Sequence, residues 1–135
     1  MRVGALDKRS NPWMLELVAG LFDADESAEQ VAHREAEEEA GLRLLKLIPI
    51  IRYFPSPGGS NEQVQLYCAT VDSRGAGGLH GLAEEGEDIR VHVMSREAAM
   101  QAMERGEIDN AASIIAQQWL QLHGQAVRDQ AGPQP

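Results

Sequence analysis

The chain has 135 residues, enough for one domain that buries roughly two-thirds of its extended-chain surface. Its formal net charge of −9 argues against a nucleic-acid-binding surface, because a phosphate backbone selects clustered Lys and Arg side chains. The most hydrophobic run, residues 42–51, is interrupted by charged residues and by Pro49, so neither a signal peptide nor a membrane span is expected. Cys68 is the only cysteine, which excludes an intramolecular disulfide and makes a reducing cytoplasm the expected setting.

The first predicted elements are strands. Residues 2–6 are expected to end one strand, and the alternation of apolar side chains over residues 13–19 predicts another. Gly20 ends this second strand. Glycine permits a tight turn there, which leaves the carbonyl of Ala19 free to face a cation.

A helix is predicted next, from Ser27 to Ala40, with Ser27 as its N-cap and Gly41 as its C-terminal stop. Three of its acidic residues, Glu35, Glu38 and Glu39, are spaced by three and four and therefore project from one face. One and two turns earlier the same face carries small apolar residues, namely Ala28, Val31 and Ala32. This face is expected to begin buried and to end in carboxylates.

Two interpretations of the acidic face stay open at the level of the residues. A run of glutamates on a helix is most simply a solvated surface, and Glu37, on the opposite side, is expected to be one such residue. On a packed face, however, each like-charge pair costs about 0.2–0.5 kcal/mol, and far more where the charges are desolvated. Arg34 offsets part of that charge. A divalent cation would supply the remainder.

The remainder of the chain alternates strands with loops and ends in helices. Strands are predicted over residues 42–54 and 63–71, paired antiparallel across a loop rich in Pro and Gly, and over residues 89–94. Between them, residues 72–88 show no periodicity; a loop of that length is usually either functional or disordered, and we favour a functional loop.

Two helices are predicted at the end of the chain. The first runs from Ser95 to about Arg105, and Asp109 or Asn110 caps the second. The packed face of the second is expected to carry Ala112, Ile115, Trp119 and Leu122. The domain is expected to span residues 1–126, with residues 127–135 forming a disordered tail.

The flanks of the acidic helix carry a longer pattern. A glycine, a glutamate six positions later, and then an R-E-apolar-x-E-E-x-G-apolar run match the fixed positions of the Nudix box: Gly20, Glu26, Arg34, Glu35, Ala36, Glu38, Glu39, Gly41 and Leu42. The chain therefore resembles a Nudix hydrolase. The resemblance implies an α/β fold in which a mixed β-sheet is sandwiched between helices, an α/β/α sandwich.

The resemblance also assigns roles within the box. The carbonyl of Ala19, Glu35 and Glu39 would bind Mg²⁺, for which Mn²⁺ is a possible substitute. Glu38 would lie at the edge of the metal cluster, and Arg34 would orient the carboxylates. Divalent ions of this kind neutralise phosphate charge and activate a water molecule at neutral pH.

Outside the box, the chain is similar to the ADP-ribose pyrophosphatase branch of the superfamily, in the segments ELVAG, SPGGSNE, HGLAEEGEDIRVHV and IDNAASIIAQQWLQLH. In that branch a mobile acidic loop carries the general base and a further metal ligand, which map onto Glu85 and Glu87. The resemblance also implies contacts to the substrate from a scattered set: Arg2, Leu21, Ser56, Glu62, Gln63 and Val64.

Members of this branch carry a further region before the position of Arg2, which completes the sheet and joins two subunits into a homodimer. We expect its absence here to weaken or alter the dimer and substrate binding. The leading hypothesis is hydrolysis of ADP-ribose to AMP and ribose 5-phosphate by attack of water on phosphorus. Two alternatives are a hydrolase of another nucleoside-diphosphate sugar such as GDP-mannose, and an impaired or non-catalytic nucleotide- or metal-binding module.

Overall fold

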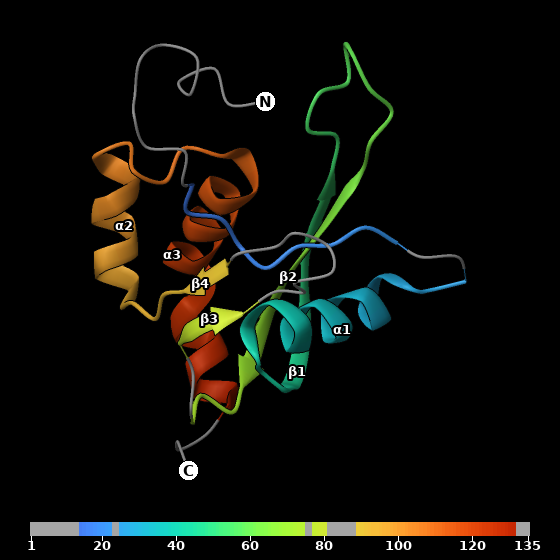
Figure 1. Cartoon of the computed structure of the whole chain (residues 1–135). Coiled ribbons are helices and arrows are strands. Elements are labelled where there is room, and N and C mark those ends of the chain that lie inside the picture. The colour runs from blue at the N-terminus through green and yellow to red at the C-terminus, as the bar shows by residue number, and fades with distance from the viewer. Residues whose placement is uncertain (1–13, 23–24, 75–76, 81–88, 132–135) are drawn as a thin grey trace.

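The computed structural model describes residues 14–22, 25–74, 77–80 and 89–131. Within these ranges one helix is followed by two pairs of strands and then by two helices, which confirms the expected α/β class (Figure 1). The elements in chain order are α1 (Ala28–Ala40), β1 (Leu44–Tyr53), β2 (Val64–Val71), β3 (Gly78–His80), β4 (Ile89–Val91), α2 (Arg96–Glu104) and α3 (Ala111–Ala131).

The largest sheet element is the hairpin of β1 and β2, which pair antiparallel as the sequence predicts. The ladder shifts its register between Pro49 and Ile51, at the point where proline has no N–H to donate to the neighbouring strand. The second pair, β3 with β4, is also antiparallel. Both pairs among the described strands are thus antiparallel, and the parallel component expected of a mixed sheet is not found in this part of the chain.

The segment expected to be an unstructured loop contains β3. Its three residues, Gly78–His80, lie in the middle of residues 72–88 and pair with β4. A strand this short shows no alternation that a sequence pattern would reveal. Because its partner is so short, β4 ends at Val91, and residues 92–94 of the predicted strand are not part of the ladder.

The prediction of a strand over residues 13–19 is wrong where the structure describes this segment. Residues 14–22 have no regular secondary structure. The alternation of apolar side chains is present, but a strand also needs a neighbour to satisfy its backbone groups. None of the described strands pairs with this segment. The predicted strand end over residues 2–6 lies outside the described residues.

Helix α1 is closed at both ends by the residues predicted to do so. The Ser27 hydroxyl accepts a hydrogen bond from the N–H of Gln30 (3.2 Å), and the Gln30 side-chain oxygen accepts one from the N–H of Ser27 (2.8 Å). This reciprocal pair is a capping box. At the other end Gly41 adopts φ 63°, a left-handed conformation that glycine reaches without strain. The helix therefore presents a fixed face to the site.

Helices α2 and α3 form a corner around a small apolar core. The predicted N-cap of α2 is confirmed, since the Ser95 hydroxyl accepts from the N–H of Ala98 at 3.1 Å. Ala99, Ala102 and Ile108 are buried together, and two partly buried side chains pack against them, Leu15 and Met103. Leu15 comes from the irregular segment 14–22, so this core anchors that segment to the corner.

The buried face of α3 differs by about one position from the prediction. The buried residues are Ser113, Ala116 and Gly124, whereas Leu122 is 80% exposed. Three of the four predicted residues, Ala112, Ile115 and Trp119, are partly buried, so the prediction is wrong only for Leu122. The fully buried residues are small, and a methyl group on Gly124 would overlap the guanidinium of Arg96 of α2.

Helix α3 also runs further than predicted. It continues to Ala131, so residues 127–131 of the predicted disordered tail are helical. Residues 132–135 lie outside the described part of the chain. Within that part, no helix combines the length and the apolar character that crossing a bilayer requires.

Candidate metal and phosphate site

The centre of the site is a close approach between α1 and the backbone of Gly20. A Cβ atom built on Gly20 would overlap the Oε1, Cδ and Cγ atoms of Glu35. Only a residue without a side chain lets the Glu35 carboxylate lie against the backbone at this position. The glycine predicted to end a strand is therefore required for a different reason, because it makes room for an acidic side chain.

A second glutamate of the same face meets the preceding residue. The N–H of Ala19 donates a hydrogen bond to Oε2 of Glu39 at 3.1 Å. Glu35 and Glu39 thus converge on the two-residue segment Ala19–Gly20, as the spacing on α1 predicts. This hydrogen bond is donated by the N–H group of Ala19. The carbonyl of the same residue is the group predicted to face a cation.

Arg34 joins the remaining carboxylates into one network. Its Nε and Nη2 donate to the two carboxylate oxygens of Glu26 at 2.9 and 3.0 Å, which is a bidentate pair. Its Nη1 donates to Glu35 at 2.7 Å and to Glu38 at 3.3 Å. Nη2 also donates to the carbonyl of Leu21 at 3.1 Å. One guanidinium therefore connects three carboxylates with the loop that precedes α1.

Burial follows the predicted division of α1 into two sides. Glu35 is only 9% exposed, and it lies beside Val31 and Ala36, which are also buried. Glu38 and Glu39 are partly buried, and Glu37 is exposed as predicted. A carboxylate as buried as that of Glu35 needs a charged partner, which here is Arg34.

The side chains present fit a hard divalent cation. Such ions prefer oxygen ligands. The acidic corner, which Glu35 and Glu39 form with Ala19 and Gly20, supplies carboxylate oxygens beside a backbone position that lacks a Cβ atom. Among the described residues, no three acidic, histidine or cysteine side chains already form a closed cluster that would hold a metal ion. The described residues thus offer part of a ligand set.

Three predicted site residues, Arg2, Glu85 and Glu87, lie outside the described residues. The assignment of the general base and of the additional metal ligand therefore stays a prediction.

The structure does not bring the other predicted substrate residues to the acidic corner. Ser56, Glu62 and Gln63 are exposed in the loop that joins β1 to β2, and Val64 begins β2. Figure 1 shows this loop projecting away from α1. Leu21, by contrast, lies at the corner, where its carbonyl is bound by Arg34 and its side chain is 83% exposed.

Next to that loop, Tyr53 at the end of β1 is the ionisable residue with a shifted pKa in the described part of the chain. Partial burial raises the pKa of the Tyr53 phenol above its usual 10.0, and the negative charge of Glu62 raises it further. Glu62 therefore lies close to the end of β1, and its charge makes the Tyr53 phenol, with its raised pKa, a still weaker acid.

Glu26 is the site residue whose structural part the sequence reasoning missed. It enters the pattern only as a fixed position of the box, and it lies eight positions from Arg34, whereas side chains that meet along one helix are three or four apart. In the structure it provides both oxygens to the Arg34 guanidinium. Only the family pattern carried a signal for this pair, because the two residues are brought together by the loop before Ser27.

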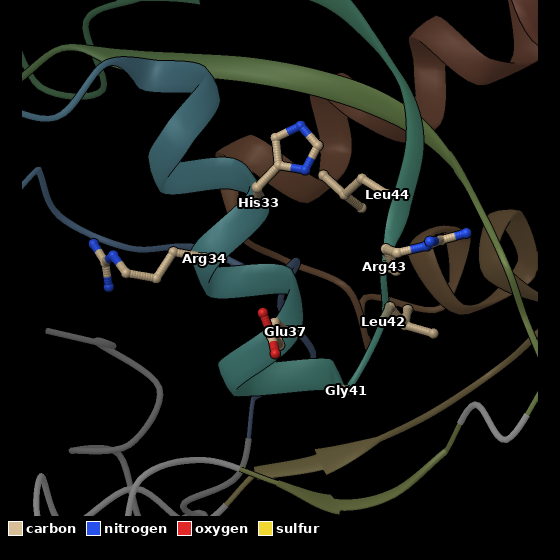
Figure 2. A pocket seen from close by; sticks show the side chains of 7 residues that line it. All are labelled: His33, Arg34, Glu37, Gly41, Leu42, Arg43 and Leu44. Atoms are coloured by element: carbon tan, nitrogen blue, oxygen red, sulfur yellow. The ribbon is translucent and has the colours of Figure 1, made fainter.

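A pocket of about 330 Å³ lies between α1 and the segment that leads from its end into β1. Figure 2 shows its lining, in which the His33 ring reaches toward Leu44 while Arg34 and Arg43 extend in opposite directions. The complete lining is His33, Arg34, Glu37, Gly41, Leu42, Arg43 and Leu44. The pocket has side chains of both charges and does not contain the Glu35 and Glu39 carboxylates.

Comparison with known proteins supplies an independent test of the family. A profile of the NUDIX domain matches residues 2–117. The chain is 52% identical over 130 residues to an ADP-ribose pyrophosphatase of Escherichia coli, covering 96% of this chain and 62% of that relative. An ADP-ribose pyrophosphatase of Haemophilus influenzae is 48% identical over 126 residues, covering 91% of this chain and 58% of the relative.

A more distant relative has a different substrate in its name. A GDP-mannose pyrophosphatase of Cronobacter sakazakii is 33% identical over 111 residues, covering 82% of this chain and 57% of that protein. The chain thus spans about six-tenths of the length of each of these relatives.

Proposed function

The chain belongs to the Nudix family, and from that membership we propose that it hydrolyses the pyrophosphate bond of ADP-ribose to AMP and ribose 5-phosphate. Two features support this reaction. The more similar of the relatives described above are ADP-ribose pyrophosphatases. In addition, the acidic corner places two carboxylates of one helix against a single backbone turn, which is a suitable place to hold metal ions beside a diphosphate.

The roles proposed for these residues are those that the family pattern implies. Glu35 and Glu39 would hold the divalent cation together with the Ala19 carbonyl, and Glu38 would lie at the edge of that group. When bound, the cation neutralises the phosphate charge and lowers the pKa of a water molecule. Arg34 keeps Glu35 and Glu38 in place through Nη1, while its bond to the Leu21 carbonyl fixes the loop that faces the substrate.

The remaining requirement is a base that takes the proton from the attacking water. Glu85 is proposed for this step and Glu87 for a further metal ligand. A loop that closes over the substrate excludes bulk water and so strengthens the electrostatic interactions within the site. Attack of water on phosphorus then gives AMP and ribose 5-phosphate, with the oxygen of water in one of the two phosphates.

The proposal includes the setting of the enzyme. Nudix hydrolases generally need a divalent metal; we take Mg²⁺ as the natural ion, with Mn²⁺ as a substitute, because the donors are carboxylate and carbonyl oxygens. We further propose a cytoplasmic location and a homodimer.

The experiment is product analysis of the purified 135-residue chain with ADP-ribose, in the presence of Mg²⁺ and after chelation. Metal-dependent formation of AMP and ribose 5-phosphate in equal amounts supports the proposal. A variant with Glu39→Gln is the matched negative control. Absence of AMP from the folded, metal-loaded protein would exclude ADP-ribose as the substrate and leave the GDP-mannose and binding-module alternatives.

GDP-mannose is the second candidate substrate, because a relative named for it covers most of the chain. The same assay with GDP-mannose, scored by GMP formation, separates the two. A higher kcat/KM for GDP-mannose than for ADP-ribose would reassign the substrate and leave the metal chemistry unchanged.

A further inference from the structure

We propose that Asn110 is a positioning residue for the metal site, acting through the irregular segment 14–22. This inference rests on the proposed function for its meaning, although its test does not require catalysis. Asn110 lies at the start of α3, remote in sequence from the acidic helix. Its side chain nevertheless bonds to the segment that ends at Ala19 and Gly20.

The Asn110 amide has two separate partners. Its oxygen accepts from the N–H of Ser113 at 3.1 Å, which caps α3. Its nitrogen donates to the carbonyl of Leu15 at 2.7 Å, across 95 positions of sequence. The first bond closes the helix, and the second ties residues 14–22 to it. One side chain thus performs both tasks, and substitution can separate them.

The segment needs such a tie because none of the described strands pairs with it. Residues 14–22 have no regular secondary structure, so within the described part of the chain their backbone is fixed at separate points. The described points are the Leu15 carbonyl on Asn110, the Ala19 N–H on Glu39, and the Leu21 carbonyl on Arg34. The last two lie within the site itself. The bond from Asn110 is the one that comes from the other side of the molecule.

The base of this tie is rigid. Leu15 packs on the buried cluster of Ala99, Ala102 and Ile108, in the corner between α2 and α3. Arg96 of α2 also donates to the Leu120 carbonyl of α3 at 3.2 Å, which fixes the two helices together. Figure 1 shows residues 14–22, in blue, running from beside α3 across to the start of α1.

The geometry limits how far Ala19 can move when Leu15 is held. Ala19 is four positions after Leu15, so the two lie at most about 14 Å apart along the chain, and freeing Leu15 gives Ala19 and Gly20 more room to shift. The close fit between Gly20 and Glu35 tolerates little displacement. Loss of the tie is therefore expected to loosen the Ala19 bond to Glu39 and to weaken cation binding.

Two substitutions remove the tie and keep the helix cap. Asn110→Asp retains an oxygen for the Ser113 N–H, and Asp caps helices as well as Asn, but it cannot donate to the Leu15 carbonyl. Asn110→Ser also caps the helix and is too short to reach Leu15. The matched control is Ser95→Ala, which removes the bond that caps α2. It lowers stability through a cap alone.

Two readouts are measured, hydrogen exchange of the Ala19 amide in the metal-free protein and Mn²⁺ affinity by calorimetry. Both Asn110 variants should exchange the Ala19 amide faster and bind Mn²⁺ more weakly, each by about tenfold, the usual size for one lost hydrogen bond. Ser95→Ala should change the melting temperature without changing either readout. If Asn110→Asp does not fold, Asn110→Ser decides.

Parent-like exchange and Mn²⁺ affinity in the folded Asn110 variants would overturn the inference. So would equal changes in Ser95→Ala, because general destabilisation would then explain both. Failure of the proposed function is recognised separately. If the Asn110 variants show the expected effects while the parent protein forms no AMP from ADP-ribose, the positioning role of Asn110 stands and the proposed reaction fails.

Discussion

Gly20→Ala tests the packing of the site most severely for the smallest chemical change. The added methyl group would meet Oε1, Cδ and Cγ of Glu35, all nearer than the 3.0 Å that real Cβ contacts respect. Rotation of the carboxylate alone does not relieve this overlap, because Cγ is involved. The whole side chain of Glu35 must move, and at 9% exposure it has little space.

The expected cost has two parts. Overpacking a close contact destabilises a protein by about 1–3 kcal/mol. Displacement of Glu35 also lengthens its 2.7 Å bond to Arg34, and a charge-assisted hydrogen bond contributes about 1.5–3 kcal/mol. These terms lower the free energy of unfolding, and because disturbing the groups that orient metal ligands typically costs about 10–100-fold in metal affinity, we expect Mn²⁺ affinity to fall by at least about tenfold.

The assay is calorimetric titration of Mn²⁺ into the folded variant, with the free energy of unfolding measured by urea denaturation. Gly58→Ala is the control, because a Cβ atom there meets nothing within 4 Å. The control should bind Mn²⁺ like the parent. If Gly20→Ala also binds like the parent, the close approach of Glu35 to Gly20 is not part of the cation site.

Four other outcomes are expected. Glu39→Gln should reduce kcat for ADP-ribose by roughly three orders of magnitude through loss of a metal ligand, while Glu37→Gln should be nearly silent; equal effects would refute the two-sided reading of α1. Arg34→Lys should lower the free energy of unfolding by about 1–3 kcal/mol in urea denaturation, because lysine lacks the fork that holds several oxygens, and an unchanged midpoint would contradict the network. Burial raises the pKa of the Cys68 thiol, so a thiol reagent at pH 8 should modify native protein far more slowly than unfolded protein, and equal rates would show that Cys68 is accessible. A hydrogen bond from Arg74 lowers the pKa of Asp72 to about 2 from 3.8, so the pair's contribution is complete above about pH 4 and is lost as pH falls toward 2; carbon NMR titration should show this midpoint, and a midpoint near 4 would disprove the pair.

The acidic helix was predictable because its local signals agree. The Ser27 cap, the apolar residues before Glu35, and the Gly41 stop all specify the same helix, and the structure reproduces each. The spacing of the glutamates also predicted which of them face inward. Interactions between neighbours on one helix follow from the helical repeat, so a sequence alone reveals them.

Contacts between distant segments were less accessible. The bidentate pair of Glu26 with Arg34 depends on the path of the loop before α1. The bond from Asn110 to Leu15 joins residues that are 95 positions apart in the sequence. Neither follows from a periodic pattern. The Asn110 side chain was considered only as a helix cap, because capping is the local part of what it does.

The errors of the sequence analysis have a common physical origin. Residues 13–19 carry the alternation of a strand, yet none of the described strands lies beside residues 14–22 to complete a ladder. Leu122 was placed on the packed face of α3 for its size, whereas the structure packs Ser113, Ala116 and Gly124 there. In both cases, tertiary neighbours decided what local preference left open.

The most direct test of the central claim is paramagnetic broadening of backbone amide signals by Mn²⁺, added in small amounts to the labelled protein. If a cation binds between α1 and the turn at Ala19 and Gly20, these two amides and those of Glu35 and Glu39 should broaden first, and Mg²⁺ should restore them. Broadening that begins elsewhere, or that leaves Gly20 sharp when metal is saturating, would contradict the account.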